Sequence, residues 1–190
     1  MFIQTEETPN PATMKFLPGR EVINSGTADF TTITDAEKKS PLALRIFNID
    51  GIEGVFLGSD FITVTKNNSK DWHVLKPSVL GAIMEHFTAG LPILNESALL
   101  QDHDSAAETE GDDSEVIGQI KELIDTRVRP AVAMDGGDIV FDSFDSGIVY
   151  LQMQGACAGC PSSTATLKMG IENMLKHYIP DVKEVVELSN

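Results

Sequence analysis

Two cysteines separated by two residues are the part of this chain with the clearest capacity for chemistry. Cys157 and Cys160 are the only cysteines among the 190 residues, and they lie in the stretch 155–163, which reads GACAGCPSS. Thiolates at this spacing are close enough to bind one metal ion or one iron–sulfur cluster. The same Cys-x-x-Cys pattern also serves thiol–disulfide exchange.

The loop that holds the cysteines is predicted to join a strand end to a helix start. Unpaired backbone N–H groups and the positive end of the helix dipole favour anions at such a junction. We therefore expect a lowered thiol pKa and a favourable site for an anionic cluster. Gly155 and Gly159 leave room for sulfur. The hydroxyls of Ser162, Ser163 and Thr164 are expected to cap the helix or to bond a sulfur.

The number of ligands indicates half a site. A cluster or a structural zinc ion takes four protein ligands, and one chain offers two thiolates. His73, His86 and His103 lie in or beyond the first predicted domain. His177 lies near the far end of the helix that starts at Cys160, roughly 25 Å away at 1.5 Å per residue. A second copy of the chain, related by a two-fold axis, would supply the other two thiolates.

Three interpretations of the cysteine pair remain open on the residues alone. The first is a cluster shared between two chains, and the second is a zinc-stapled interaction module. The third is a thiol–disulfide oxidoreductase. Such a protein would hold the cysteines in a thioredoxin-like βαβ unit, whereas the strand before these cysteines is predicted to belong to a hairpin, which disfavours this interpretation. Other side chains of this half are interpreted as structural. The methionines expected in the core are Met134, Met153, Met169 and Met174. The acids expected in a turn are Asp135 and Asp138.

Residues 115–190 predict a small domain of order α-β-β-α-β. Apolar positions recur at helical spacing in the first and fourth segments and alternate in the hairpin. Pro130 is expected to bend or end the first helix. The expected segments are a helix from Ser114 to about Arg127, strands at Ile139–Phe144 and Ile148–Gln154, a helix to Tyr178, and a strand at Val182–Leu188. We expect a three-stranded sheet with both helices on one face.

Residues 1–92 predict a second small domain of the α+β class. A helix over 35–48 should be divided by Pro41, and another should run from Pro77 to Thr88. The expected strands are Phe2–Thr5, Met14–Phe16, Ile52–Leu57 and Phe61–Lys66. The fold class is therefore α+β, with two small domains.

An acidic segment, 93–114, is predicted to be a flexible linker between the domains. No lysine or arginine occurs between Lys76 and Lys121, and the stretch from about 95 to 115 carries eight acids. Without them the net charge of −15 falls to −7, so the acidity belongs largely to the linker. The negative charge argues against nucleic acid and anionic membranes as partners. No apolar run approaches the roughly 20 residues that cross a bilayer.

The first residues, MFIQTEE, have neither the pattern of a secretory signal nor that of a transit peptide. Cysteines in a reducing compartment are more often metal-binding or redox-active than structural disulfides. The expected location is the bacterial cytoplasm, or the mitochondrial matrix if a presequence has been removed.

The motifs also carry a family resemblance. Residues 115–188 resemble the NifU-like C-terminal domain through Arg129-Pro130, the MDGGD of 134–138 and the cysteine stretch 155–163. Residues 1–90 resemble the Nfu N-terminal domain through TEETPNP at 5–11 and MKF at 14–16. Together they resemble an Nfu-type iron–sulfur scaffold or carrier, which is not an enzyme.

The resemblance implies a specific site and set of partners. Cys157 and Cys160 of two protomers would hold a bridging [4Fe–4S] cluster, or a [2Fe–2S] cluster, in a homodimer. The cluster would pass to apo iron–sulfur proteins, and assembly factors would be further partners.

Overall fold

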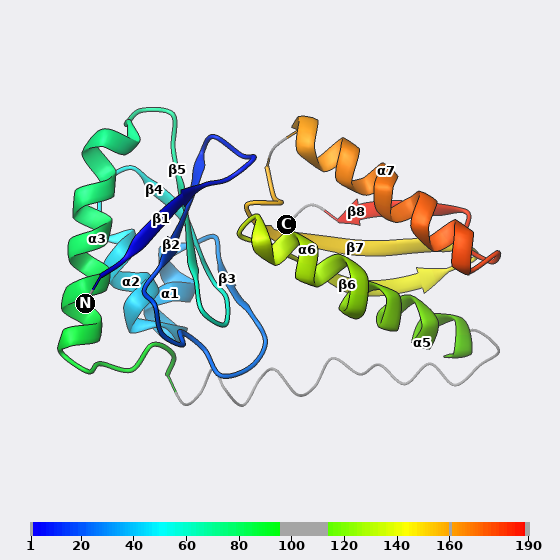
Figure 1. Ribbon diagram of the computed structural model, residues 1–190, viewed down its shortest axis with the longest axis horizontal. Coiled ribbons are helices and arrows are strands. Elements are labelled where there is room, and N and C mark those ends of the chain that lie inside the picture. The colour runs from blue at the N-terminus through cyan, green and yellow to red at the C-terminus, as the bar shows by residue number, and fades with distance from the viewer. Residues whose placement is uncertain (1, 96–113, 160, 189–190) are drawn as a thin grey trace. The chain divides into compact units, whose positions relative to one another are not determined.

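The computed structural model describes residues 2–95, 114–159 and 161–188, and it divides into two compact units (Figure 1). The first unit ends at Ala106 and the second begins at Ala107. The predicted linker lies largely outside the described residues. Each unit has the mixed α and β composition that the sequence predicts, which confirms the fold class.

The described residues of the first unit form a five-stranded antiparallel sheet of order β1-β2-β5-β4-β3, with three helices on one face (Figure 1). The strands are β1 (Gln4–Glu7), β2 (Thr13–Leu17), β3 (Ala28–Phe30), β4 (Ile52–Leu57) and β5 (Ile62–Lys66). The helices are α1 (Ile33–Lys39), α2 (Pro41–Phe47) and α3 (Trp72–Thr88). Apolar side chains of the helices, such as Leu42, Ile46 and Val79, are buried against the sheet residues Phe16 and Val64.

Pro41 divides the first helical segment as predicted. Ser40 ends α1 and also caps α2, because its Oγ accepts a hydrogen bond of 3.0 Å from the N–H of Ala43. One prediction for this unit was wrong, and one element was not predicted. The helix α3 begins at Trp72, since Pro77 in its second turn removes one backbone donor without ending it. The short strand β3 was not predicted, because three residues carry too little periodicity.

The last described residues of this unit are held against the helices. The Nε2 atom of His86 lies 3.0 Å from the carbonyl oxygen of Pro92. The hydroxyl of Ser40 donates to the carbonyl of Ile93 at 2.6 Å, and the N–H of Asn95 donates to the last residue of α1 at 2.8 Å. The segment 91–95, which we call the exit strap, is therefore fixed by side-chain and backbone bonds.

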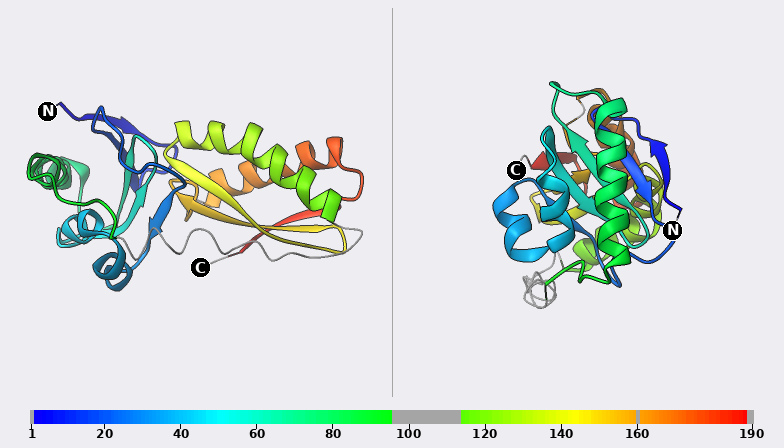
Figure 2. Two further views of the ribbon diagram at one scale, coloured as in Figure 1. Left: turned by 90° about the horizontal axis from the view of Figure 1, so that it is seen from below. Right: turned by 90° about the vertical axis from the view of Figure 1, so that its left-hand side faces the viewer.

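The second unit is a three-stranded sheet covered on one face by helices (Figure 2, left). Its elements are α5 (Ser114–Leu123), a π-helical turn (Ile124–Val128), α6 (Arg129–Met134), β6 (Gly137–Asp145), β7 (Ile148–Gly155), α7 (Pro161–Tyr178) and β8 (Glu184–Leu188). The strand β7 is central, antiparallel to β6 and parallel to β8. The predicted order and the one-sided helix layer are confirmed.

The helical segments of this unit differ from the prediction at Pro130. The chain does not leave the helix there, because Pro130 lies in the first turn of α6, where a missing N–H costs no hydrogen bond. The core prediction was right for Met153, which is buried, and for Met174, which packs against the core. It was wrong for Met134 and Met169, which are 76% and 65% exposed. Among the described helices none is both long and apolar enough to cross a membrane.

Candidate metal centre

The loop after β7 places Cys157 at the junction of a strand and a helix. Gly155 ends β7 with a φ of +62°, which turns the chain out of the sheet. The N–H of Ala156 donates to the carbonyl of Gly136 at 3.1 Å, and the N–H of Cys157 donates to Gln154 at 3.3 Å. The backbone on either side of the thiol is therefore bonded to the end of β7 and to the turn before β6.

A hydroxyl of α7 holds the loop from the other side. The Oγ1 of Thr164 donates to the carbonyl oxygen of Cys157 at 3.2 Å. Of the three hydroxyls predicted to act here, Thr164 therefore bonds the loop backbone rather than a sulfur. The side chains of Ser162 and Ser163 lie outside the described residues, so their roles stay predictions.

Gly137 forms the floor under the thiol. It pairs with Gly155 across the sheet, and a Cβ atom at Gly137 would lie 2.4 Å from the Sγ of Cys157 and 2.9 Å from its backbone nitrogen. No side chain fits at that distance. Sequence reasoning placed the flanking acids, Asp135 and Asp138, in a turn and assigned Gly137 no contact with the cysteine loop. Gly136 alone has the positive φ, +82°, that the turn needs. The turn needs only one glycine, so the presence of a second one, Gly137, was the sign in the sequence that another group packs closely against it.

A partly buried ion pair joins α6 to the start of β6. The Nε and Nη2 of Arg129 donate to Oδ1 and Oδ2 of Asp138 at 2.9 and 2.8 Å. The Asp138 residue is 3% exposed, and its Oδ1 also accepts from the N–H of Ile139 at 2.8 Å. A third contact links Arg129 to Asp125 at 3.1 Å.

These carboxylates raise the pKa of Arg129 above its usual range, and the largest cause is its hydrogen bonding to Asp138. Asp135 lies in the turn after α6, as expected. Asp138 does not, because it is the second residue of β6. Sequence reasoning missed this pair, since nothing in single-sequence periodicity links an arginine to an acid nine positions later.

Burial raises the pKa of the Cys157 thiol to about 12, and the negative charges of Asp135, Asp138 and Glu187 add to that effect. The predicted lowering was therefore wrong for this cysteine. Cys157 is only 7% exposed and packs within the core of the unit, while α7 begins four residues later, at Pro161. Desolvation of the charged form outweighs the helix dipole here. The thiol is protonated at neutral pH, so metal binding must displace a proton.

The other candidate ligands do not gather around Cys157 in the described part of the chain. Cys160 and His103 lie outside the described residues. His73 and His86 belong to the first unit, and His177 lies in the last turn of α7. Among the described residues no group of three His, Cys, Asp or Glu side chains is arranged to hold a metal ion.

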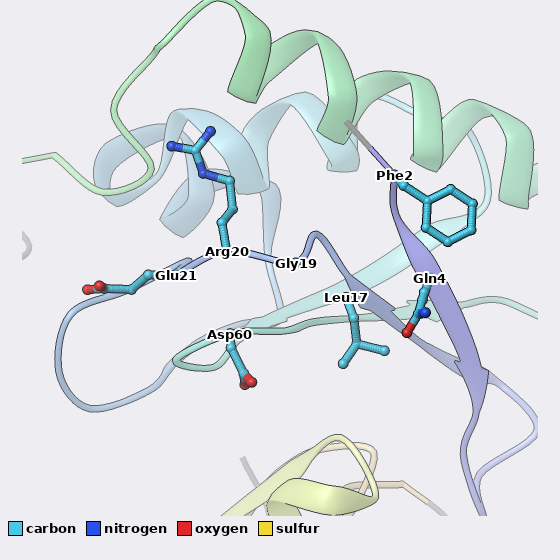
Figure 3. A pocket seen from close by; sticks show the side chains of 7 residues that line it. All are labelled: Phe2, Gln4, Leu17, Gly19, Arg20, Glu21 and Asp60. Carbon is cyan, nitrogen blue, oxygen red and sulfur yellow. The ribbon is translucent and has the colours of Figure 1, made fainter.

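The first unit has a surface hollow of about 510 Å³ beside β1 (Figure 3). Its lining residues are Phe2, Gln4, Leu17, Gly19, Arg20, Glu21 and Asp60. The hollow contains no cysteine or histidine, and Figure 3 shows the Arg20 guanidinium and the Asp60 carboxylate pointing in different directions. The Arg20 guanidinium instead lies 5.2 Å from the ring centre of Phe87. Converging groups for catalysis or metal binding are not found there.

Comparison with known families agrees with the two units. Residues 3–90 match the family model described as "Scaffold protein Nfu/NifU N terminal", and residues 120–186 match the model "NifU-like domain". A human protein, "NFU1 iron-sulfur cluster scaffold homolog, mitochondrial", is 50% identical over 189 residues, which cover 99% of this chain and 72% of the relative. The chain belongs to the Nfu/NifU family. The resemblance drawn from the motifs is therefore confirmed.

Two other Nfu/NifU relatives are similar over almost all of the chain. "NifU-like protein 4, mitochondrial" of Arabidopsis thaliana is 52% identical over 187 residues, covering 97% of this chain and 65% of the relative. The NFU1 scaffold homolog of Drosophila willistoni is 50% identical over 189 residues, covering 99% and 64%. The chain thus spans slightly less than two thirds of the length of these two relatives. The NifU-like match contains both cysteines, Gly137 and the Arg129–Asp138 pair.

Proposed function

We propose that this protein is an iron–sulfur cluster scaffold, which carries a cluster and delivers it to apo-proteins without itself catalysing a reaction. One observation carries the proposal within this family. The Cys157 loop is bonded to the end of β7, to the turn before β6 and to α7, and its sulfur rests on a glycine that leaves no room for a side chain. A thiol held in this way is a preformed ligand.

We propose Cys157 and Cys160 as the ligands, with two protomers sharing one [4Fe–4S] cluster. Four thiolates are the usual ligand set of such a cluster, and two chains with two cysteines each supply that number. The two-fold symmetry of a homodimer suits this arrangement. A [2Fe–2S] cluster has the same ligand requirement and is the alternative cargo.

The raised pKa of Cys157 gives delivery a proton requirement. Each thiolate of the scaffold is replaced on iron by a thiolate of the target protein. The target thiol loses its proton when it binds iron, and the released sulfur of Cys157 takes one up, because its pKa of about 12 lies far above neutral pH. Protonation opposes rebinding, so the exchange favours departure of the cluster toward a target with more acidic thiols.

The same pKa argues against a thiol–disulfide oxidoreductase. The attacking cysteine of such enzymes has a lowered pKa, so that the thiolate is present at neutral pH. Cys157, the first cysteine of the pair, is buried and protonated instead. A zinc-stapled module needs four zinc ligands, from one chain or from two. The metal content of the purified protein distinguishes it from a cluster scaffold.

For the rest of the chain, we propose that residues 1–92 recognise targets or assembly factors and that 93–114 link them to the cluster domain, 115–190. The described residues of the first unit include no cysteine. We place the protein in a reducing compartment, either the bacterial cytoplasm or the mitochondrial matrix. The names of the human, plant and insect relatives describe those proteins as mitochondrial, which is compatible with the second location.

The deciding experiment is the iron and sulfide content of anaerobically reconstituted protein, with its absorption spectrum and mass in solution. A shared four-iron cluster requires about two irons and two sulfides per chain in a dimer. One iron per chain in a dimer would indicate a [2Fe–2S] cluster. Zinc without sulfide would replace the scaffold by a zinc module. A reversible disulfide in a colourless monomer that reduces insulin would indicate an oxidoreductase.

A further inference from the structure

The Arg129–Asp138 ion pair lies beside the backbone that supports the cysteine loop. Asp138 is paired in register with Gln154, and the preceding residue, Gly137, is paired with Gly155. The first two residues of β6 are therefore opposite the last two residues of β7, where the loop begins. Whatever fixes this end of β6 also fixes the base of the loop.

The carboxylate of Asp138 fixes that end in two directions. Both of its oxygens accept from the Arg129 guanidinium, which joins β6 to α6, and Oδ1 also accepts from the N–H of Ile139 in β6 itself. Between these bonded residues lie Gly136, in the turn, and Gly137, the first residue of β6. The carbonyl of Gly136 receives the N–H of Ala156, and Gly137 supports the Cys157 sulfur.

We propose that Arg129 and Asp138 are positioning residues for the cysteine loop, and that they act through Gly136 and Gly137 rather than by touching the cluster. This inference rests on the proposed function of the loop as a cluster ligand. The two-pronged geometry is what matters, since a guanidinium binds both carboxylate oxygens in one plane and an ammonium does not. Partners in the shell beyond the ligands commonly change metal retention by 10–100-fold when they are replaced.

The same arginine supplies a matched control. Its third partner, Asp125, lies one helical turn before it, and the side chain of Asp125 is 59% exposed. Asp125 does not contact β6 in any of the hydrogen bonds that the structure shows. Asp125→Asn and Asp138→Asn therefore remove the same charge from the same guanidinium, and only the second loosens the base of the loop.

Two measurements test the inference. In the Cys160→Ser background, cluster-free reduced protein is treated with iodoacetamide over a range of pH. The alkylation rate of Cys157 divided by its thiolate fraction reports how often the loop opens, because the charge of Asp138 itself raises the pKa of this thiol. In the chain with both cysteines, the half-life of the reconstituted cluster is measured against an iron chelator. We expect Asp138→Asn to raise the corrected alkylation rate and to shorten the half-life by about tenfold or more. Asp125→Asn should change both by less than twofold.

Global unfolding also exposes Cys157, so the free energy of unfolding of each variant is measured by denaturant titration. Positioning requires that the corrected alkylation rate rise by more than the unfolding constant does. A rise that only matches the unfolding constant, or equal effects of Asp125→Asn and Asp138→Asn, would overturn the inference. Arg129→Lys keeps the charge but loses the two-pronged contact, so it should behave like Asp138→Asn. Wild-type behaviour of this variant also overturns the inference, and the variant serves if Asp138→Asn does not fold.

Failure of the proposed function and failure of the positioning inference are distinguished by different measurements. If the wild-type protein takes up no iron or sulfide, the scaffold proposal fails. The alkylation measurement still decides whether the ion pair positions the loop.

Discussion

The α-carbon of Gly137 faces the sulfur of Cys157 across a gap too small for a methyl group, because a Cβ there would lie 2.4 Å from Sγ. The constraint is not one of backbone conformation, since Gly136 and not Gly137 has the positive φ in this turn. It is one of space, and it ties the identity of a residue in β6 to the position of Cys157, the ligand that we propose after β7.

Gly137→Ala should therefore displace the cysteine loop. We expect the second unit to lose about 1–3 kcal/mol of stability, the usual cost of extra volume in a packed site, and the protein to retain less iron after reconstitution. Denaturant unfolding and iron analysis measure the two effects. Gly170→Ala is the control, because a Cβ at this site in α7 meets nothing within 4 Å. It should be neutral or stabilising by up to about 1 kcal/mol. Equal behaviour of the two variants would show that the contact is unimportant.

Cys157→Ala should abolish cluster binding while both units remain folded. The thiol is buried, so its loss leaves a small cavity that we expect to cost about 1 kcal/mol. Iron and sulfide content should fall to background, and circular dichroism should remain that of the parent protein. An unfolded second unit would instead identify Cys157 as a ligand of a structural metal on which the fold depends.

The stability of cluster-free protein should fall on the alkaline side in a way that depends on Cys157. The pKa of its thiol is raised by burial to about 12 in the folded state, so the folded protein binds this proton more tightly than the unfolded chain. The stabilisation is complete below about pH 9 and is lost as the pH rises toward 12. A pKa difference of about three corresponds to roughly 4 kcal/mol at most. Denaturant unfolding from pH 8 to 11 should show a steeper decline for the parent protein than for Cys157→Ala. Parallel curves would contradict the raised pKa.

The first unit should lose stability on the acid side through His86. This residue is fully buried, its Nε2 lies beside the Pro92 carbonyl, and its Nδ1 has no hydrogen-bond partner among the described residues. Burial lowers its pKa below 6.5, and the charge of Arg45 adds to this. The unfolded chain therefore binds the proton more readily, so stability is full above about pH 6.5 and declines as the pH falls below it.

His86→Gln tests this acid dependence. Glutamine keeps a donor for the Pro92 carbonyl but cannot titrate. The variant should show a flatter stability curve between pH 7.5 and 5, with the exit strap retained. Hydrogen exchange of residues 91–95 would report the strap directly. A parent protein whose stability is unchanged over this range would contradict the prediction.

Sequence reasoning located the elements better than their contacts. Periodicity and proline placed the helix break at Pro41, the β6–β7 hairpin and the long helix after the cysteines, because those signals act over neighbouring residues. It did not find that Gly137 supports Cys157 or that Arg129 binds Asp138. Both relationships join residues whose proximity depends on the completed sheet.

The pKa of Cys157 was mispredicted for a related reason. The helix start beside the cysteines is visible in the sequence, whereas the burial of the thiol depends on how the loop folds back over β6. A local electrostatic argument thus gave the opposite sign from the desolvation that the tertiary fold imposes. The ligand roles of Cys157 and Cys160 stay predictions.

The π-helical turn Ile124–Val128 has a consequence for tolerance to length changes. Such a turn holds one residue more than an α-helical turn, and each residue advances the chain by about 100° around the helix axis. Removing a single residue from this turn would restore a regular α-helix and rotate Arg129 by about that angle relative to α5. Either α5 or the Arg129 guanidinium would then lose its present contacts. A one-residue deletion here should therefore be more harmful than most substitutions at the same positions.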